Sequence, residues 1–163
     1  TKTVTSTIDV TESPIALTVD PTNSYIQAGT SESNNYRDIK LYVGRNYYTG
    51  GLKLALEKIT VNQASQQNNS TRVLVRTLEV NDVFKNEYVT ESAGIEQERP
   101  ISQTWTETTN TANGKAMNIT LRCFGLYMQG APGNTSKSFT LHFKATDDNG
   151  QSQTITARVD VNL

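Results

Sequence analysis

The chain of 163 residues has little cysteine, tryptophan or histidine, with one of each. The single cysteine, Cys123, cannot form an internal disulfide. A chain of this length buries roughly two-thirds of its unfolded surface, so it needs neither a disulfide nor a metal to fold. Charged residues make up only 19%, the net charge is −1, and no run of like charges is longer than two. The basic stripe of a nucleic-acid-binding protein is therefore missing, and we expect no nucleic-acid partner.

Long apolar runs are also missing. None approaches the roughly 18 residues of a membrane span, so no membrane insertion is expected. The sequence starts Thr1-Lys2-Thr3 with neither methionine nor signal peptide, which indicates a processed, exported protein. Hydrophobic residues are only 35%, and Thr, Asn, Ser and Gln fill the difference. That balance disfavours helices and favours an all-β extracellular domain, because exposed strand faces carry threonine.

Strand signals run along most of the chain. Apolar and polar residues alternate with a period of two, the spacing of a half-buried strand. We expect strands at residues 3–10, 15–19, 38–43, 71–80, 101–106, 117–128, 139–145 and 155–163. Residues 52–61 fit either a strand or a helix, and a strand is favoured. Residues 63–70 and 130–134 are expected to be polar turns or loops, and 81–99 to be irregular with one helical turn. About nine short strands, with a hairpin at Asn113-Gly114, are typical of a β-sandwich.

The first and last strands resemble each other. Residues 1–11 align without gaps on residues 152–162. The identical pairs are Thr3 and Thr154, Thr5 and Thr156, Asp9 and Asp160, and Val10 and Val161. Alternating Thr and Val also produce such matches by chance. If the match is meaningful, it suggests an incomplete sandwich whose groove is filled by a strand from a neighbour. That head-to-tail contact does not close, so it builds a filament.

Three segments share features with one protein family. Residues 2–10 combine a lysine with alternating Thr, Ile and Val and then an acidic residue, although Asp9-Val10 departs from the family's Asp-Pro. Residues 100–105 are similar to a central Pro-(Val/Ile)-Ser strand of the family, and residues 133–145 to the strand that ends its native members. On these segments the chain resembles the pilins of the bacterial chaperone–usher pathway, most closely the class 5, or alpha-type, colonisation-factor pilins.

The resemblance implies an immunoglobulin-like β-sandwich completed by a donor strand. It divides the chain into an N-terminal donor-strand extension (1–13), a pilin domain (14–146), a linker or turn (147–151) and a C-terminal donor strand (152–163). It implies a fimbrial subunit that polymerises by donor-strand exchange and supports adhesion to host cells. The implied partners are neighbouring pilin subunits, a periplasmic chaperone, an outer-membrane usher and a host-cell receptor or glycan, on an extracellular fimbrium reached through the periplasm.

Alternation predicts which side chains insert into a groove. The expected donor residues are Val4, Ile8, Val10, Ile155, Ala157, Val159, Val161 and Leu163. The acceptor groove would lie beside Phe139, Leu141 and Phe143. Two origins remain open for the last strand. Residues 148–151 resemble the short linker of self-complemented pilins engineered in the laboratory, but Asn149-Gly150 is also a strong signal for an ordinary hairpin.

No catalytic or metal-binding constellation stands out, so we expect neither an enzyme nor a cofactor. His142 falls on the outward side of its strand, away from any triad. Cys123 shares an apolar face with Ile119 and Leu121 and is expected to be a buried packing thiol. One histidine and one cysteine cannot hold a transition metal. The acidic residues Glu91, Glu96 and Glu98 are expected to form a solvated loop rather than a glycosidase pair.

One motif suggests a different function. Arg45, Tyr47 and Tyr48 place a cation and two aromatic rings in a loop, and such groups stack on sugars or anchor protein contacts. A carbohydrate-binding tip adhesin using these candidate glycan contacts is therefore an alternative, as is a jelly-roll virion or tail protein. The simpler structural alternative is that the loop packs its rings on the sandwich.

Overall fold

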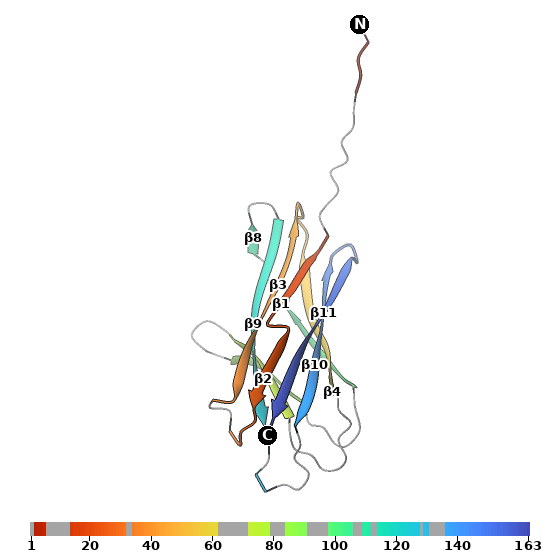
Figure 1. Cartoon of the computed structure of the whole chain (residues 1–163). Coiled ribbons are helices and arrows are strands. Elements are labelled where there is room, and N and C mark those ends of the chain that lie inside the picture. The colour runs from red at the N-terminus through yellow and green to blue at the C-terminus, as the bar shows by residue number, and fades with distance from the viewer. Residues whose placement is uncertain are drawn as a thin grey trace.

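The structure is a computed structural model with two β-sheets (Figure 1). It describes residues 2–5, 14–31, 34–61, 72–78, 84–90, 98–105, 109–111, 114–127, 129–130 and 136–163. Every regular element in these ranges is a strand, which confirms the all-β prediction. In the part of the chain that the structure describes, no helix is long and apolar enough to cross a membrane.

The first sheet is antiparallel throughout. Its strands, in spatial order, are β1 (Ala16–Asp20), β3 (Tyr36–Asn46), β9 (Gly114–Leu126), β5 (Arg72–Leu78) and β6 (Phe84–Thr90), with β8 (Thr109–Thr111) paired to β9. Thr111 lies opposite Gly114, so β8 and β9 form a hairpin as predicted, but Gly114 is the first residue of β9 and Asn113 lies outside the described residues.

The second sheet contains the C-terminal strand as an internal member. Its order is β2 (Asn23–Gln27), β11 (Ser152–Asn162), β10 (Lys137–Asp147), β4 (Leu52–Val61) and β7 (Glu98–Trp105). The pairs are antiparallel except for β2 and β11, which run parallel. The chain crosses from β1 in one sheet to β2 in the other through Pro21 and Thr22, where the Asp20–Pro21 peptide bond is cis.

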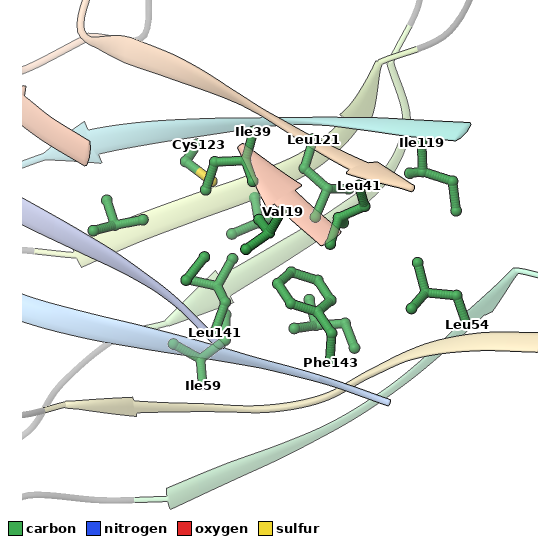
Figure 2. Close-up of a cluster of buried hydrophobic side chains, with 14 of the residues drawn as sticks. Val19, Ile39, Leu41, Leu54, Ile59, Ile119, Leu121, Cys123, Leu141 and Phe143 are labelled. Atoms are coloured by element: carbon green, nitrogen blue, oxygen red, sulfur yellow. The ribbon is translucent and has the colours of Figure 1, made fainter. Parts of the chain in front are cut away.

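A single large hydrophobic core lies between the sheets (Figure 2). Every second residue of β10, from Lys137 to Asp147, is buried, as the alternating sequence predicts. Removing such side chains from water is the main favourable term in folding. The core joins side chains of both sheets, among them Val19, Ile39, Leu41, Leu121 and Cys123 from the first and Leu54, Ile59, Leu141 and Phe143 from the second.

A β-bulge explains why residues 52–61 fit both a strand and a helix. Leu54 and Leu56 are buried at the spacing of a strand, but the next buried residue, Ile59, comes three residues later. Near Glu57 the pairing register of β4 shifts against both β10 and β7. The extra residue returns Ile59 to the core face. The segment is therefore a strand, as favoured, and its helix-like spacing marks the bulge.

Three strands were not expected from the sequence. Residues 84–90, expected to be irregular, form β6, and Glu98, expected in a loop, begins β7. Residues 23–27 and 109–111, for which no strand was expected, form β2 and β8. Both β2 and β6 lie at the edge of a sheet. In β2 only Ser24 and Ile26 are buried, so its strand character comes from main-chain pairing with β11 rather than from an apolar pattern.

The predicted N-terminal strand at residues 3–10 lies mostly outside the described residues. The described part, residues 2–5, belongs to no strand and is exposed, and Val4 is 83% exposed. These residues lie beyond the end of the two sheets (Figure 1). The predicted loops at 63–70 and, apart from Gly130, at 130–134 also lie outside the described residues.

The first residue of β10 predicts a pH-dependent stability. Lys137 is buried on the core face, and burial lowers its pKa from 10.5 to about 8. Below pH 8 the ammonium is charged in both folded and unfolded chains, so the full cost of burying it is present. Between pH 8 and 10.5 the unfolded chain binds the proton that the folded chain has lost, so this cost fades as pH rises. Replacing the lysine with methionine removes the cost altogether.

We therefore expect Lys137→Met to raise the free energy of unfolding by roughly 3 kcal/mol at pH 7. The gain should shrink progressively between pH 8 and 10.5. Urea unfolding at a series of pH values measures it, with Lys144→Met on the outer face of the same strand as the control. A gain that stays constant across that pH range would contradict the assigned cause.

Candidate functional site

The candidate site is the place that β11 occupies in the second sheet. A tight turn at residues 148–151 leads into it from β10. The Gly150 amide donates to the Asp147 carbonyl at 3.2 Å, and the Asp147 amide donates to the Gln151 carbonyl at 3.1 Å. Gly150 has φ of 82°, which a side chain would strain. The segment expected as a linker or turn is thus a turn, and Asp147 is the last residue of β10.

The main chain of β11 is hydrogen-bonded on both edges. Against β10 its register runs from Ser152 opposite Thr146 to Val161 opposite Lys137. Against β2 the parallel register covers residues 158–162. Two further bonds extend this second ladder, from the Arg158 amide to the Thr22 carbonyl at 2.8 Å and from the Ala28 amide to the Asn162 carbonyl at 2.6 Å. The strand therefore bridges two strands that do not pair with each other.

The inner face of β11 supplies part of the core. Ala157, Val159 and Val161 are fully buried, and Ile155 is half-buried against the same core. Phe139, Leu141 and Phe143 of β10 lie directly opposite Val159, Ala157 and Ile155. The predicted donor and acceptor residues of this strand pair are thus brought together along one face.

Leu163 is the exception among the predicted inserted residues. Its exposed fraction is 46%. The β11 ladder ends at Asn162, so Leu163 has no neighbouring strand to cover it, and its amide donates instead to the Ser136 hydroxyl at 3.0 Å. The prediction that Leu163 inserts is therefore corrected. Val4, also predicted as a donor residue, is exposed, and Ile8 and Val10 lie outside the described residues.

Near its end, β11 reaches the opposite sheet at a glycine. A Cβ atom built on Gly125 of β9 would lie 3.0 Å from Val161 Cγ1 and 2.8 Å from Ile26 Cγ2. Real Cβ contacts are rarely so short, so glycine at this position makes room for both side chains. Val161 and Ile26 are register partners on β11 and β2. Gly125 therefore lies directly against the contact between Val161 of β11 and Ile26 of β2.

The outer face of β11 carries a buried carboxylate. Asp160 is only 8% exposed. The Ser138 hydroxyl, directly opposite on β10, donates to Asp160 Oδ1 at 2.5 Å, and Arg158 Nε donates to the same oxygen at 2.8 Å. Arg158 also donates to the Ser138 hydroxyl at 3.0 Å. In the sequence, Asp160 stands out only as one of the identical positions of the repeat, and this match is the available signal for the contact.

The loop that holds the candidate glycan contacts is a packed corner, which is the structural alternative that the sequence left open. Arg45 is buried and forms an ion pair with the buried carboxylate of Asp147. Its guanidinium lies 4.5 Å from the centroid of the Tyr48 ring. Tyr48 is buried, and its hydroxyl donates to the Gly51 carbonyl at 3.1 Å and accepts from the Asp148 amide at 3.0 Å. Arg45 and Tyr48 are therefore corrected as glycan contacts, because neither is accessible, and only Tyr47 is exposed.

Among the remaining candidates, the structure describes the surroundings of Cys123 and His142. Burial, with a smaller contribution from the nearby Asp38 charge, raises the pKa of Cys123 to about 12, so its thiol stays protonated and unreactive. His142 is half-buried, with Nε2 2.9 Å from the Thr60 hydroxyl. Within the described ranges, no three His, Cys, Asp or Glu residues are grouped to hold a metal. Glu91 and Glu96 lie outside those ranges.

Comparison with known proteins leaves the family open. No family model and no curated protein matches the chain. Solved structures that resemble it include AvmM, which catalyses macrocyclization in alchivemycin A biosynthesis (7% identity, TM-score 0.34, covering 91% of this chain and 89% of that one). PapD-like domain 7 of human CEP192 has 9% identity and a TM-score of 0.30, covering 99% and 93%. The collagen-binding subdomain ACE19 of an Enterococcus faecalis surface protein has 9% identity and a TM-score of 0.28, covering 90% and 96%. Similarity this low assigns neither a family nor a function.

The buried ion pair predicts a large effect of a single substitution. Arg45→Met leaves the Asp147 carboxylate buried without its cation, so we expect a loss of about 3–5 kcal/mol in the free energy of unfolding. Urea unfolding measures the loss, and Arg37→Met, at an exposed arginine, should change the value by less than about 0.5 kcal/mol. Adding Asp147→Asn to Arg45→Met should restore part of the loss. Equal effects at the two arginines would show that the pair is unimportant.

The inserted strand predicts a contrast between its two faces. Val159→Asp places a carboxylate in the core and should cost more than about 4 kcal/mol, enough to unfold a marginally stable domain. Thr156→Asp, on the exposed face of the same strand, should cost less than about 1 kcal/mol. Thermal unfolding followed by circular dichroism compares the two. Similar melting temperatures for both variants would exclude the insertion of Val159 into the core.

Proposed function

We propose that the protein is a structural subunit of a bacterial fimbrium that polymerises by donor-strand exchange. The observation that carries this proposal is the position of β11, a terminal strand held between β2 and β10 with hydrogen bonds on both edges. In this proposal the sandwich is immunoglobulin-like, and β11 stands for the strand that a neighbouring subunit supplies in the fibre.

The groove that β11 fills has the chemistry of a strand acceptor. Without β11, the facing edges of β2 and β10 would carry unpaired main-chain groups. The fully buried side chains of Ile26, Phe139 and Leu141, on either side of it, would also lose a neighbour. Exposed strand edges beside apolar surface pair readily with another chain. A strand of alternating apolar residues satisfies both demands at once.

The strength of the contact suits a filament. Burying the valines at 159 and 161 contributes roughly 1.5–3 kcal/mol each, with Ala157, Ile155 and the main-chain hydrogen bonds adding to this. Such a contact works by binding alone, with neither turnover nor cofactor. The groove would need a temporary occupant before assembly, which is the role proposed for a periplasmic chaperone on the way to an outer-membrane usher.

The N-terminus offers the outgoing strand. Residues 2–5 are exposed and belong to neither sheet. The sequence of residues 1–11 matches that of residues 152–162 at four positions and keeps the alternation. A subunit that carries such a strand and also contains such a groove can join head to tail without closing. Support of adhesion to host cells, on the extracellular surface, follows from the fibre rather than from a site on the subunit.

A shortened chain tests the proposal. Residues 1–147 alone should be unstable or self-associate, because the groove is then empty. Adding a synthetic peptide of residues 152–163 should restore one cooperative melting transition, and the same peptide with Val159→Asp should not. Circular dichroism follows the melting, and analytical ultracentrifugation follows the association.

A stable monomer of residues 1–147 that ignores the peptide would make β11 an ordinary member of a hairpin. The fibre proposal would then fail. A second test is electron microscopy of the mixture: short fibres should form from residues 1–147 after removal of the peptide, since the N-terminus of each copy then meets an empty groove.

A further inference from the structure

Correct insertion of a strand requires a defined register as well as the right groove. A slip of one residue would turn the apolar face of β11 to solvent, so that register is unfavourable because it loses the burial of these side chains. A slip of two residues keeps every side chain on its own face and keeps the main-chain bonds. Alternating valine and alanine discriminate weakly against such a slip, so contacts that are specific to one position must decide the register.

Two contacts made by adjacent residues of β11 depend on register. On the outer face, Asp160 accepts a hydrogen bond from Ser138, its direct partner on β10. On the inner face, Val161 lies against Gly125, where a Cβ atom would be 3.0 Å from its Cγ1. After a slip of two residues Asp160 would lose Ser138, and a different side chain would lie over Gly125. The groove therefore recognises an Asp-Val dipeptide, from both faces of the strand.

The same dipeptide occurs at the matching place near the N-terminus. In the gapless alignment of residues 1–11 with 152–162, Asp9 falls on Asp160 and Val10 on Val161. These are two of the four identities, and they are the two whose counterparts make the position-specific contacts. Thr154 and Thr156, the counterparts of the other two, are exposed. Arg158 has Thr7 as its counterpart, but Arg158 is itself exposed and adds little to the contact.

We propose that Ser138 and Gly125 are the register-determining residues of the groove, and that its partner is the Asp9-Val10 segment of a second copy of this chain. The inference rests on the proposed donor-strand exchange and specifies it. Ser138 donates to the Asp9 carboxylate as it does to that of Asp160, and Val10 takes the place of Val161 over Gly125. Ser138 is a specificity residue, since a strand without the carboxylate still finds the same apolar groove.

The test uses the whole chain with a protease site inserted between Asn149 and Gly150. Cutting after folding leaves β11 in the groove as a separate peptide that can be exchanged. Fluorescently labelled peptides of residues 1–11 then compete for the groove, in the natural sequence and with Asp9→Ala. We expect the natural peptide to bind at least tenfold more tightly than the Asp9→Ala peptide. On a Ser138→Ala groove the two affinities should converge to within about threefold.

Three results separate the ideas. Equal binding of the two peptides to the natural groove would overturn the role of Ser138 while leaving donor-strand exchange intact. Failure of the natural N-terminal peptide, with successful exchange of a 152–163 peptide, would overturn the second copy as partner. The inference would be supported if the two affinities differ on the natural groove and converge on the Ser138→Ala groove. An Asp9→Asn peptide, whose amide oxygen can still accept from Ser138, should bind better than the Asp9→Ala peptide.

A double-mutant cycle in the uncut chain gives an independent measurement. Ser138→Ala and Asp160→Ala are each expected to raise the unfolding equilibrium constant. The factor by which the double variant raises this constant should be at least fivefold smaller than the product of the two single factors, because both substitutions remove the same hydrogen bond. If the two single effects on the unfolding equilibrium constant simply multiply, Ser138 does not interact with the Asp160 carboxylate. The control is Thr154→Ala combined with Asp160→Ala: Thr154 is exposed and lies six residues before Asp160 on the same strand, so the two effects should multiply.

Discussion

Every main-chain amide and carbonyl inside a sheet needs a partner, and in this protein β11 meets that need for two strands at once. β10 and β2 do not pair with each other, and β11 bonds to both. Buried main-chain groups without partners are costly, so the second sheet is continuous only while this strand is in place. The core depends on it too, because Ala157, Val159 and Val161 extend the apolar face that begins on β10.

The two faces of β11 have different physical roles. The inner face contributes nonspecific affinity, because burial of branched apolar side chains depends on area rather than on partner identity. The outer face contributes specificity, because the hydrogen bond between Ser138 and Asp160 exists in only one register. Gly125 adds a steric condition from the opposite sheet. Most of the affinity thus comes from the apolar inner face, while under the proposed exchange the register depends on Ser138 and on the close fit of Val161 over Gly125.

A second constraint acts at the end of the β10–β11 hairpin. Asp147 pairs with Arg45 and also accepts the amides of Asn149 and Gln151, so it joins the turn to the end of β3. Asp148 accepts the Gly51 amide at 2.7 Å, while Tyr48 packs against Arg45. Buried charges are tolerated only when paired and hydrogen-bonded, and here both conditions are met. The turn is therefore held against the β3–β4 loop, which explains why the side chains of Arg45 and Tyr48 are inaccessible.

Alternation along the chain was enough to assign the faces of the long strands. It placed in the core Ile119, Leu121 and Cys123 of β9 and Phe139, Leu141 and Phe143 of β10, and all six are buried. A period of two is a local property of an extended chain, so it can be read without knowing the neighbours. Tertiary structure alone decided that the polar segment β2 pairs with β11, that Arg45 and Tyr48 are buried, that Leu163 is exposed and that Ser138 meets Asp160. Each of these depends on which strand lies alongside. The alternation within a strand shows which of its faces is buried, but it does not show which distant strand it pairs with.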